Sequence, residues 1–171
     1  MIDPSRRLVP STVPEDHPIH DAAESGELAR VLAFLDQQPS LVHDINRAGG
    51  HPLHRAVIGG SADVVTLLLD RGAGVDARDG DGATPLHNAA LSGHRDLATL
   101  LLDRHADVEA RDSESGATPL YHAAAWGRKA VVELLLSRGA NANAKSKSGV
   151  TPREAAEKNN FRETADLLKN P

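Results

Sequence analysis

Apolar residues recur along the chain in clusters that share one internal pattern. Runs of three leucines occupy Leu67–Leu69, Leu100–Leu102 and Leu134–Leu136. Their spacing corresponds to a repeat with a period of roughly 33 residues. Valine pairs precede the first and third runs, at Val64–Val65 and Val131–Val132. These segments predict helices that bury their leucines between neighbouring units of a repeat.

A second motif recurs with the same period. Its clearest copies begin at His51 (H-P-L-H-R-A), Thr84 (T-P-L-H-N-A) and Thr118 (T-P-L-Y-H-A), with degenerate copies at His17 and Thr151. A threonine before a proline suits the start of a helix, because its side chain can cap a free backbone N–H while proline needs none. Glycine follows most of these helices and suits their ends. Each unit is therefore predicted as helix–turn–helix with a projecting hairpin-like loop, over residues 17–50, 51–83, 84–117, 118–150 and 151–171.

The motif and its period resemble the ankyrin-repeat family, whose signature is T-P-L-H-x-A with a period of about 33 residues. The resemblance covers roughly positions 17–169, nearly the whole chain. It implies an all-α fold, an ankyrin-repeat solenoid of five helix–turn–helix units with projecting hairpin-like loops. It also implies that the histidine of the motif braces the loop of its own or the neighbouring unit.

Departures from the repeat carry their own predictions. His105 stands where the equivalent residues are Gly72 and Gly139, and Asn160 stands in the glycine position between the last two helices. Histidine and asparagine are among the residues that tolerate a left-handed backbone, so we expect both to adopt it. One inserted residue within 113–115 is expected to enlarge the loop before Thr118.

Composition excludes several classes of function. The chain has no cysteine, which removes disulfide and thiolate chemistry. Its 19 basic and 24 acidic residues give a net charge of −5, so nothing favours nucleic acid. The apolar runs are too short to cross a bilayer, and no secretory signal follows the first arginines. A cytoplasmic location is expected.

The two ends of the chain differ from its middle. Residues 1–16 contain three prolines and no repeat motif, so a flexible N-terminal segment is predicted there, ahead of the repeat domain at 17–171. The last unit is polar where the others are apolar, at Lys158, Asn159 and Arg162. Terminal units of a solenoid need a wettable outer face, so the array is expected to be complete and monomeric.

Nine histidines raise the question of a metal site or an enzyme. His17, His20, His51 and His54 form two H-P-x-H pairs in stacked units, and imidazoles bind zinc, nickel or copper. Their spacing matches no known ligand signature, so a structural role is favoured over a metal. Ser, His and Asp follow the repeat period without a nucleophile motif or a phosphate loop. We therefore expect no catalytic residues, no cofactor and no metal.

The resemblance implies that a partner protein lies in a concave groove between the loop tips and the first helix of each unit. In register, Ile58, Leu91, Ala125 and Trp126 should line up there as an apolar strip. A polar rim should flank it, formed by Asp81, Glu114, Lys147 and Lys158. A strip of this kind with a polar rim is typical of a binding site, and Trp126 is the only tryptophan in the chain.

Two further positions near this groove vary between units. Tyr121 replaces the motif histidine and is expected to make the same local hydrogen bond through its hydroxyl. His122 aligns with Arg55 and Asn88, and we expect this column to be accessible.

The sequence thus predicts a protein-binding module, either an adaptor or modulator of another protein. A dedicated inhibitor of a partner enzyme or toxin is the alternative, and a histidine-rich metal-binding protein is a weaker one. The identity of the partner does not follow from the sequence, because a fold alone does not supply a function.

Overall fold

The structure is a computed structural model that describes residues 16–169, and these residues contain ten α-helices and one short 3-10 helix. No strand occurs within these residues. The elements run in chain order as α1 (Ile19–Glu24), α2 (Leu28–Gln37), η1 (Pro39–His43), α3 (Pro52–Gly59), α4 (Ala62–Asp70), α5 (Pro85–Ser92), α6 (Arg95–Asp103), α7 (Pro119–Ala125), α8 (Lys129–Ser137), α9 (Pro152–Lys158) and α10 (Arg162–Leu167).

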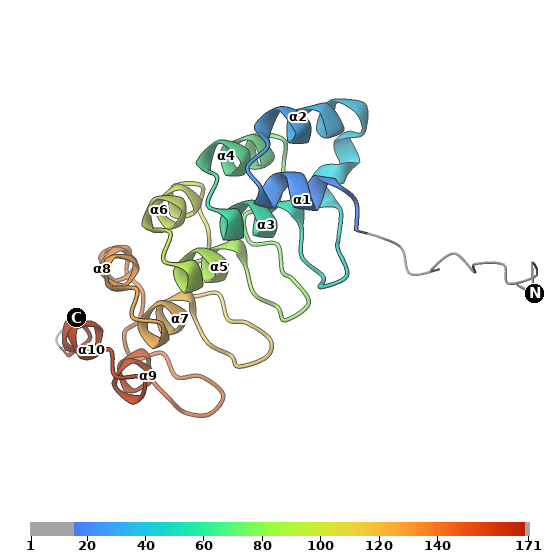
Figure 1. Cartoon of the computed structure of the whole chain (residues 1–171). Helices are drawn as coiled ribbons and strands as arrows, with labels where there is room; N and C mark the ends of the chain where they lie inside the picture. Colours follow the sequence, from blue (N-terminus) through green and yellow to red (C-terminus); the bar gives the residue numbers. More distant parts are fainter. Residues whose placement is uncertain (1–15, 170–171) are drawn as a thin grey trace, which may run out of the picture.

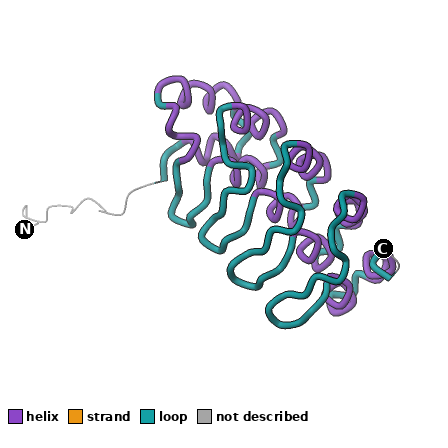
Figure 2. The backbone as a smooth tube through the Cα atoms, turned by 180° about the vertical axis from the view of Figure 1, so that it is seen from behind, coloured by secondary structure: helices purple, strands orange, loops and turns teal. Residues whose placement is uncertain are grey.

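The helices stand in two parallel rows. The first helices of the units (α1, α3, α5, α7, α9) form one row, and the second helices (α2, α4, α6, α8, α10) form the row beside it (Figure 1). Hairpin-like loops project side by side from the row of first helices (Figure 2). This arrangement confirms the predicted all-α ankyrin-repeat solenoid. The unit boundaries stay a prediction, and the flexible segment predicted for 1–16 lies outside the described residues apart from Asp16.

The motif residues start the first helices as predicted. Thr84 and Thr118 are extended residues at the N-caps of α5 and α7, and proline follows each at the first helical position. His51 caps α3 in the same way. The first unit differs, because Pro18 caps α1 from a helical conformation without a side-chain bond. The degenerate motif of that unit therefore begins a shorter helix.

Leucine and alanine form one continuous core between the two rows. Leu53, Leu86 and Leu120 of the first helices are fully buried, as are Leu68, Leu101 and Leu135 of the second helices. Full burial of one such side chain contributes roughly 1.5–3 kcal/mol. Each of these units contributes buried leucines from both rows to a core that runs through its neighbours, so no unit buries its apolar face alone.

The motif histidines tie consecutive units together. In His54, Nδ1 accepts the backbone N–H of His51, so the proton lies on Nε2, which donates to the carbonyl of Ala83 at 3.1 Å. In His87, Nδ1 accepts from Thr84 N–H and Nε2 donates to Ala117 O at 3.2 Å. The predicted bracing role is confirmed for these two residues.

The two positions predicted to be left-handed are left-handed. The φ angle is 66° at His105 and 67° at Asn160, and these are the non-glycine residues with positive φ among residues 16–169. Gly72, which holds the His105 position one unit earlier, has a φ of 92°. The backbone strain at His105 is therefore confined to that residue, and glycine at this position would relieve it.

We expect His105→Gly to raise the free energy of unfolding by roughly 0.5–1 kcal/mol, because glycine adopts a positive φ without steric cost. His105 is exposed and contributes little packing that the change would remove. Urea unfolding of the two proteins measures the difference. A variant that unfolds at the same or a lower urea concentration would contradict the expectation.

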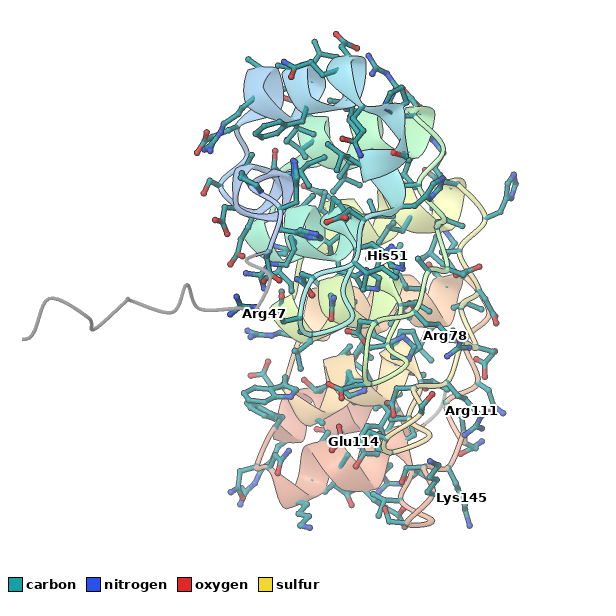
Figure 3. All side chains as sticks on the ribbon, turned by 90° about the vertical axis from the view of Figure 1, so that its right-hand side faces the viewer. Arg47, His51, Arg78, Arg111, Glu114 and Lys145 are labelled. Atoms are coloured by element: carbon teal, nitrogen blue, oxygen red, sulfur yellow. The ribbon has the colours of Figure 1, made fainter. Side chains whose placement is uncertain are left out.

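The tips of the hairpin loops are joined by backbone hydrogen bonds. Gly80 N–H donates to Ala48 O, Ser113 N–H to Asp81 O, and Lys147 N–H to Ser115 O, at 2.8–3.0 Å. Arginine side chains add a second connection, because Arg78 and Arg111 each donate to a carbonyl of the next loop; Figure 3 labels both residues. These hydrogen bonds hold the neighbouring loops together in a row beside the first helices.

Candidate partner-binding surface

The predicted apolar strip lies at the C-terminal ends of three consecutive first helices. Ile58 lies at the end of α3 with 40% of its surface exposed, Leu91 at the end of α5 with 38% exposed, and Trp126 caps α7 with 55% exposed. Ala125 is half-buried. Ile58, Leu91 and Trp126 are three of the six large apolar side chains that are exposed within residues 16–169, and they occupy nearly equivalent positions in successive units.

The backbone beneath the strip is held by the following unit. Arg128 Nε donates to Leu91 O at 2.9 Å, Asn159 Nδ2 donates to Ala125 O at 2.7 Å, and His94 Nε2 lies 3.4 Å from Ile58 O. These contacts satisfy carbonyl groups that a helix end leaves without partners. The strip therefore has a preorganised backbone, which reduces the entropy that binding would cost.

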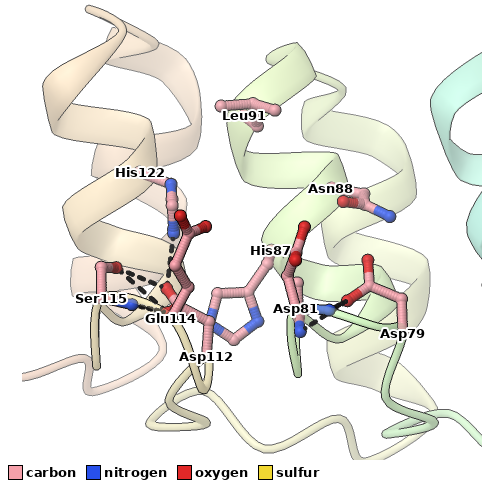
Figure 4. Close-up of a pocket in the computed structure, with 10 residues that line it drawn as sticks. Asp79, Asp81, His87, Asn88, Leu91, Asp112, Glu114, Ser115 and His122 are labelled. Atoms are coloured by element: carbon pink, nitrogen blue, oxygen red, sulfur yellow. Dashed lines mark hydrogen bonds and ion pairs between the residues drawn. The ribbon is translucent and has the colours of Figure 1, made fainter. Parts of the chain in front are cut away.

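The predicted rim residues fall into two groups. Asp81 and Glu114 lie on adjacent hairpin tips, and both are exposed and line one pocket with Leu91 (Figure 4). Lys147 instead bonds back to the carbonyls of Ser113 and Glu114. Lys158 ends α9, and its ammonium group makes no hydrogen bond or ion pair within residues 16–169. The structure thus places the two acidic rim residues in one pocket with Leu91, whereas neither lysine lines that pocket.

The pocket lies between two hairpin tips and two first helices, and its volume is about 170 Å³. Its walls come from the tips at 79–83 and 112–115, from α5 and from α7 (Figure 4). No lysine or arginine of the described part of the chain lines it. The lining residues are Asp79, Asp81, Ala83, His87, Asn88, Leu91, Asp112, Glu114, Ser115 and His122.

Asp79 and Asp112 shape the tips at the base of this pocket. Asp79 Oδ1 accepts the backbone N–H groups two and four residues later, whereas Asp112 Oδ1 accepts those three and four residues later. This shift accommodates the residue inserted within 113–115. Neither aspartate was a predicted site residue. A recurring polar residue at this loop position, which Asn46 also occupies, was the available signal.

His122 of α7 binds the second oxygen of Asp112, with Nε2 and Oδ2 2.9 Å apart. Burial alone would raise the pKa of Asp112, but hydrogen bonds from His122 and Ser115 outweigh it and lower that pKa to about 2. Asp112 therefore remains ionised at any physiological pH. Arg55, Asn88 and His122, the column expected to be accessible, are half-buried. Two of these residues, Asn88 and His122, line the pocket.

His87, which also lines the pocket, is neutral where Asp112 is charged. Burial lowers the pKa of His87 to about 4, against a weaker opposing effect of its bond to the carbonyl of Ala117. His87 is thus neutral near pH 7 and adds no positive charge to the pocket. Tyr121, the next motif residue, does not replace this bond: its hydroxyl has no hydrogen-bond partner among residues 16–169, so the bond predicted for it was wrong.

Local hydrogen bonds already engage ring nitrogens of three of the four histidines considered for a metal. His20 Nε2 pairs with Asp44 at 2.9 Å, His17 Nδ1 accepts the N–H of Ile19, and both nitrogens of His54 are engaged. Across residues 16–169, no group of three or more His, Cys, Asp or Glu side chains is placed to hold a metal ion. The metal-binding alternative therefore gains no support from the geometry.

Comparison with known proteins agrees with the fold. The family model described as ankyrin repeats (3 copies) matches residues 19–112 and 74–146. The chain is also 37% identical over 63 residues to FPV240, a putative ankyrin repeat protein of Fowlpox virus (strain NVSL). That match covers 37% of this chain and 15% of the viral protein. Among residues 16–169, no helix has the length and apolar character needed to cross a membrane.

Proposed function

Because this chain belongs to the ankyrin-repeat family, whose repeats are generally protein-interaction modules and typically non-enzymatic, we propose that it binds a partner protein and catalyses no reaction. The partner-binding surface is the groove between the hairpin tips and the ends of α3, α5 and α7. We further propose that the protein is monomeric and located in the cytoplasm, as the sequence predicts. One observation carries it: Ile58, Leu91 and Trp126 are exposed at the C-terminal ends of the first helices of three consecutive units.

When a partner covers exposed apolar side chains, their burial stabilises the complex by about 25 cal/mol per Å² of apolar surface buried. Tryptophan is among the residues most enriched in the side chains that dominate binding energy. Trp126 is more than half exposed, and the carbonyl just before it is fixed by Asn159. A partner can therefore bury the indole ring without reorganising the end of the helix.

We expect Trp126→Ala to weaken binding of the partner about tenfold or more while leaving the fold intact. The partner is first captured on the immobilised protein from a lysate of the source organism and identified by mass spectrometry. Titration calorimetry with the purified partner then gives the dissociation constants of wild type and variant. Unchanged affinity would contradict the assignment of Trp126 to the binding surface.

The chain offers a matched control for the groove. Leu28 at the start of α2 is 40% exposed, almost as Leu91 is, but lies in the other row of helices. Leu91→Glu should abolish capture, whereas Leu28→Glu should leave it unchanged. Equal losses in the two variants would show that general surface polarity, rather than the groove, controls the interaction.

A further inference from the structure

Two carboxylates beside the apolar strip have no partner in the described part of the protein. The side chains of Asp81 and Glu114 are exposed on neighbouring hairpin tips, and neither makes an ion pair or side-chain hydrogen bond within residues 16–169. By contrast, Asp36, Asp70 and Asp103 on the second helices are each paired with an arginine. The pocket therefore carries two negative charges that no ion pair within residues 16–169 neutralises.

The base of the same pocket adds to this charge. Asp112 is 6% exposed and ionised, and the carboxylate of Asp79 lies beside the tip that it shapes. The basic side chains on these loops form no ion pair with Asp81 or Glu114 within residues 16–169: Arg78 donates to Gly82 O and Arg111 O, and Lys147 donates to backbone carbonyls of the tip that carries Glu114. Carboxylates framed by low-dielectric walls attract cations and repel anions.

The size of the pocket indicates what kind of group it receives. Its volume of about 170 Å³ lies below the range of roughly 300–1,000 Å³ typical of small-molecule sites. Leu91 belongs both to the pocket wall and to the apolar strip. A long cationic side chain matches this arrangement, because its methylene stem packs on apolar surface while its charged end reaches a carboxylate.

We propose that the groove binds a basic peptide segment of the partner: one arginine or lysine enters the pocket between Asp81 and Glu114, and an adjacent apolar residue packs on Leu91 and Trp126. This inference rests on the proposed function and specifies the chemistry of the partner. Arginine is the better fit, because its planar fork can bind two carboxylate oxygens at once.

A library of random linear peptides displayed on phage tests this chemistry directly, with the full chain as target. We expect the enriched peptides to combine an arginine or lysine with a nearby apolar residue. Synthetic copies should bind at least tenfold more weakly to Asp81→Asn/Glu114→Gln and should weaken as salt rises. Quenching or shift of the single tryptophan's fluorescence reports binding. Failure to enrich any peptide, or enrichment of neutral or acidic ones, would overturn the proposal.

The control variant removes the same charge elsewhere. Asp63→Asn/Glu133→Gln neutralises two exposed carboxylates on α4 and α8, in the other row of helices. An equal loss in this variant would mean that net charge, not the pocket, attracts the peptide. Neutral peptides that are lost with Trp126→Ala would overturn the basic-segment inference and leave the groove as the binding surface. Peptides indifferent to Trp126→Ala and Leu91→Glu would instead contradict the proposed function.

Discussion

Gly59→Ala should destabilise the protein by about 2 kcal/mol, even though alanine is favoured over glycine inside a helix. Gly59 is the last residue of α3, and a methyl group there would overlap the carbonyl oxygen of Glu24 and lie 2.7 Å from its carbonyl carbon. The obstructing atoms belong to the backbone of the preceding unit, so no side-chain rotation relieves the clash. Overpacking costs roughly 1–3 kcal/mol or more, and helix propensity returns at most about 1 kcal/mol.

The measurement is urea unfolding followed by circular dichroism, with Ser92→Ala as the matched control. Ser92 occupies the same register one unit later, at the end of α5, and already carries a Cβ there. The control should change the free energy of unfolding by at most about 0.5 kcal/mol, as surface substitutions usually do. A Gly59→Ala protein as stable as wild type would show that α1 and α3 are not held as closely as the structure places them.

Much of the fold followed from the sequence because the motif residues act locally. Thr84 starts α5 within one turn, and the positive φ angles of His105 and Asn160 follow from the glycines that hold their positions in other units. Each of these assignments needs only neighbouring residues and the period of the repeat. Periodicity then propagates one local solution along the chain, which is why five imperfect copies predicted one solenoid.

The features that escaped the sequence depend on contacts between units. The overlap at Gly59 arises from the close approach of α1, and the pocket arises because two hairpin tips converge on α5 and α7. The hydroxyl of Tyr121 was expected to take the place of the histidine nitrogens, yet a phenol extends in a different direction from an imidazole and has no bond within residues 16–169. The repeat register identifies which residues occupy equivalent positions in successive units, but it does not give the distances between neighbouring helices and loops.

The same kind of contact between units holds the backbone of the candidate site. Ile58, Leu91 and Ala125 each belong to one unit, and a side chain of the next unit contacts the backbone carbonyl of each, as Arg128 holds Leu91. A substitution that loosens one interface should therefore weaken binding in the neighbouring part of the groove without touching the strip. Variants such as Gly59→Ala separate this indirect effect from the direct one of Trp126→Ala, since only the former lowers stability.

Lowering the pH from 7 to 5 should reduce the free energy of unfolding by about 2 kcal/mol through His87 alone. Its pKa falls from the ordinary value of 6.5 to about 4 in the folded state, chiefly because burial disfavours the charged ring. Between these two values the unfolded chain binds a proton that the folded chain does not, so stability rises with pH. The contribution is complete above pH 6.5 and is lost as the pH falls toward 4, where the loss totals about 3 kcal/mol at roughly 1.36 kcal/mol per pH unit.

His87→Gln isolates this contribution, because glutamine does not titrate. The variant should be less stable than wild type at pH 7, since it loses the paired bonds to Thr84 and Ala117. Its stability should then fall less than that of wild type between pH 7 and 5, by about 2 kcal/mol. Free energies of unfolding from urea titrations at several pH values give the two slopes. Parallel slopes would mean that His87 is protonated in the folded protein as readily as in the unfolded chain.

Two neighbouring groups with shifted pKa values leave this comparison intact. Asp112 has a pKa of about 2 in the folded state, below its ordinary value of 3.8. A depressed carboxyl pKa stabilises the fold above the unfolded value and is lost as the pH falls through the folded one, so its effect is confined below about pH 4. Burial also lowers the pKa of His54, but that residue is present in both proteins and cancels in the difference. The difference between the two slopes therefore reports the proton that burial keeps from His87.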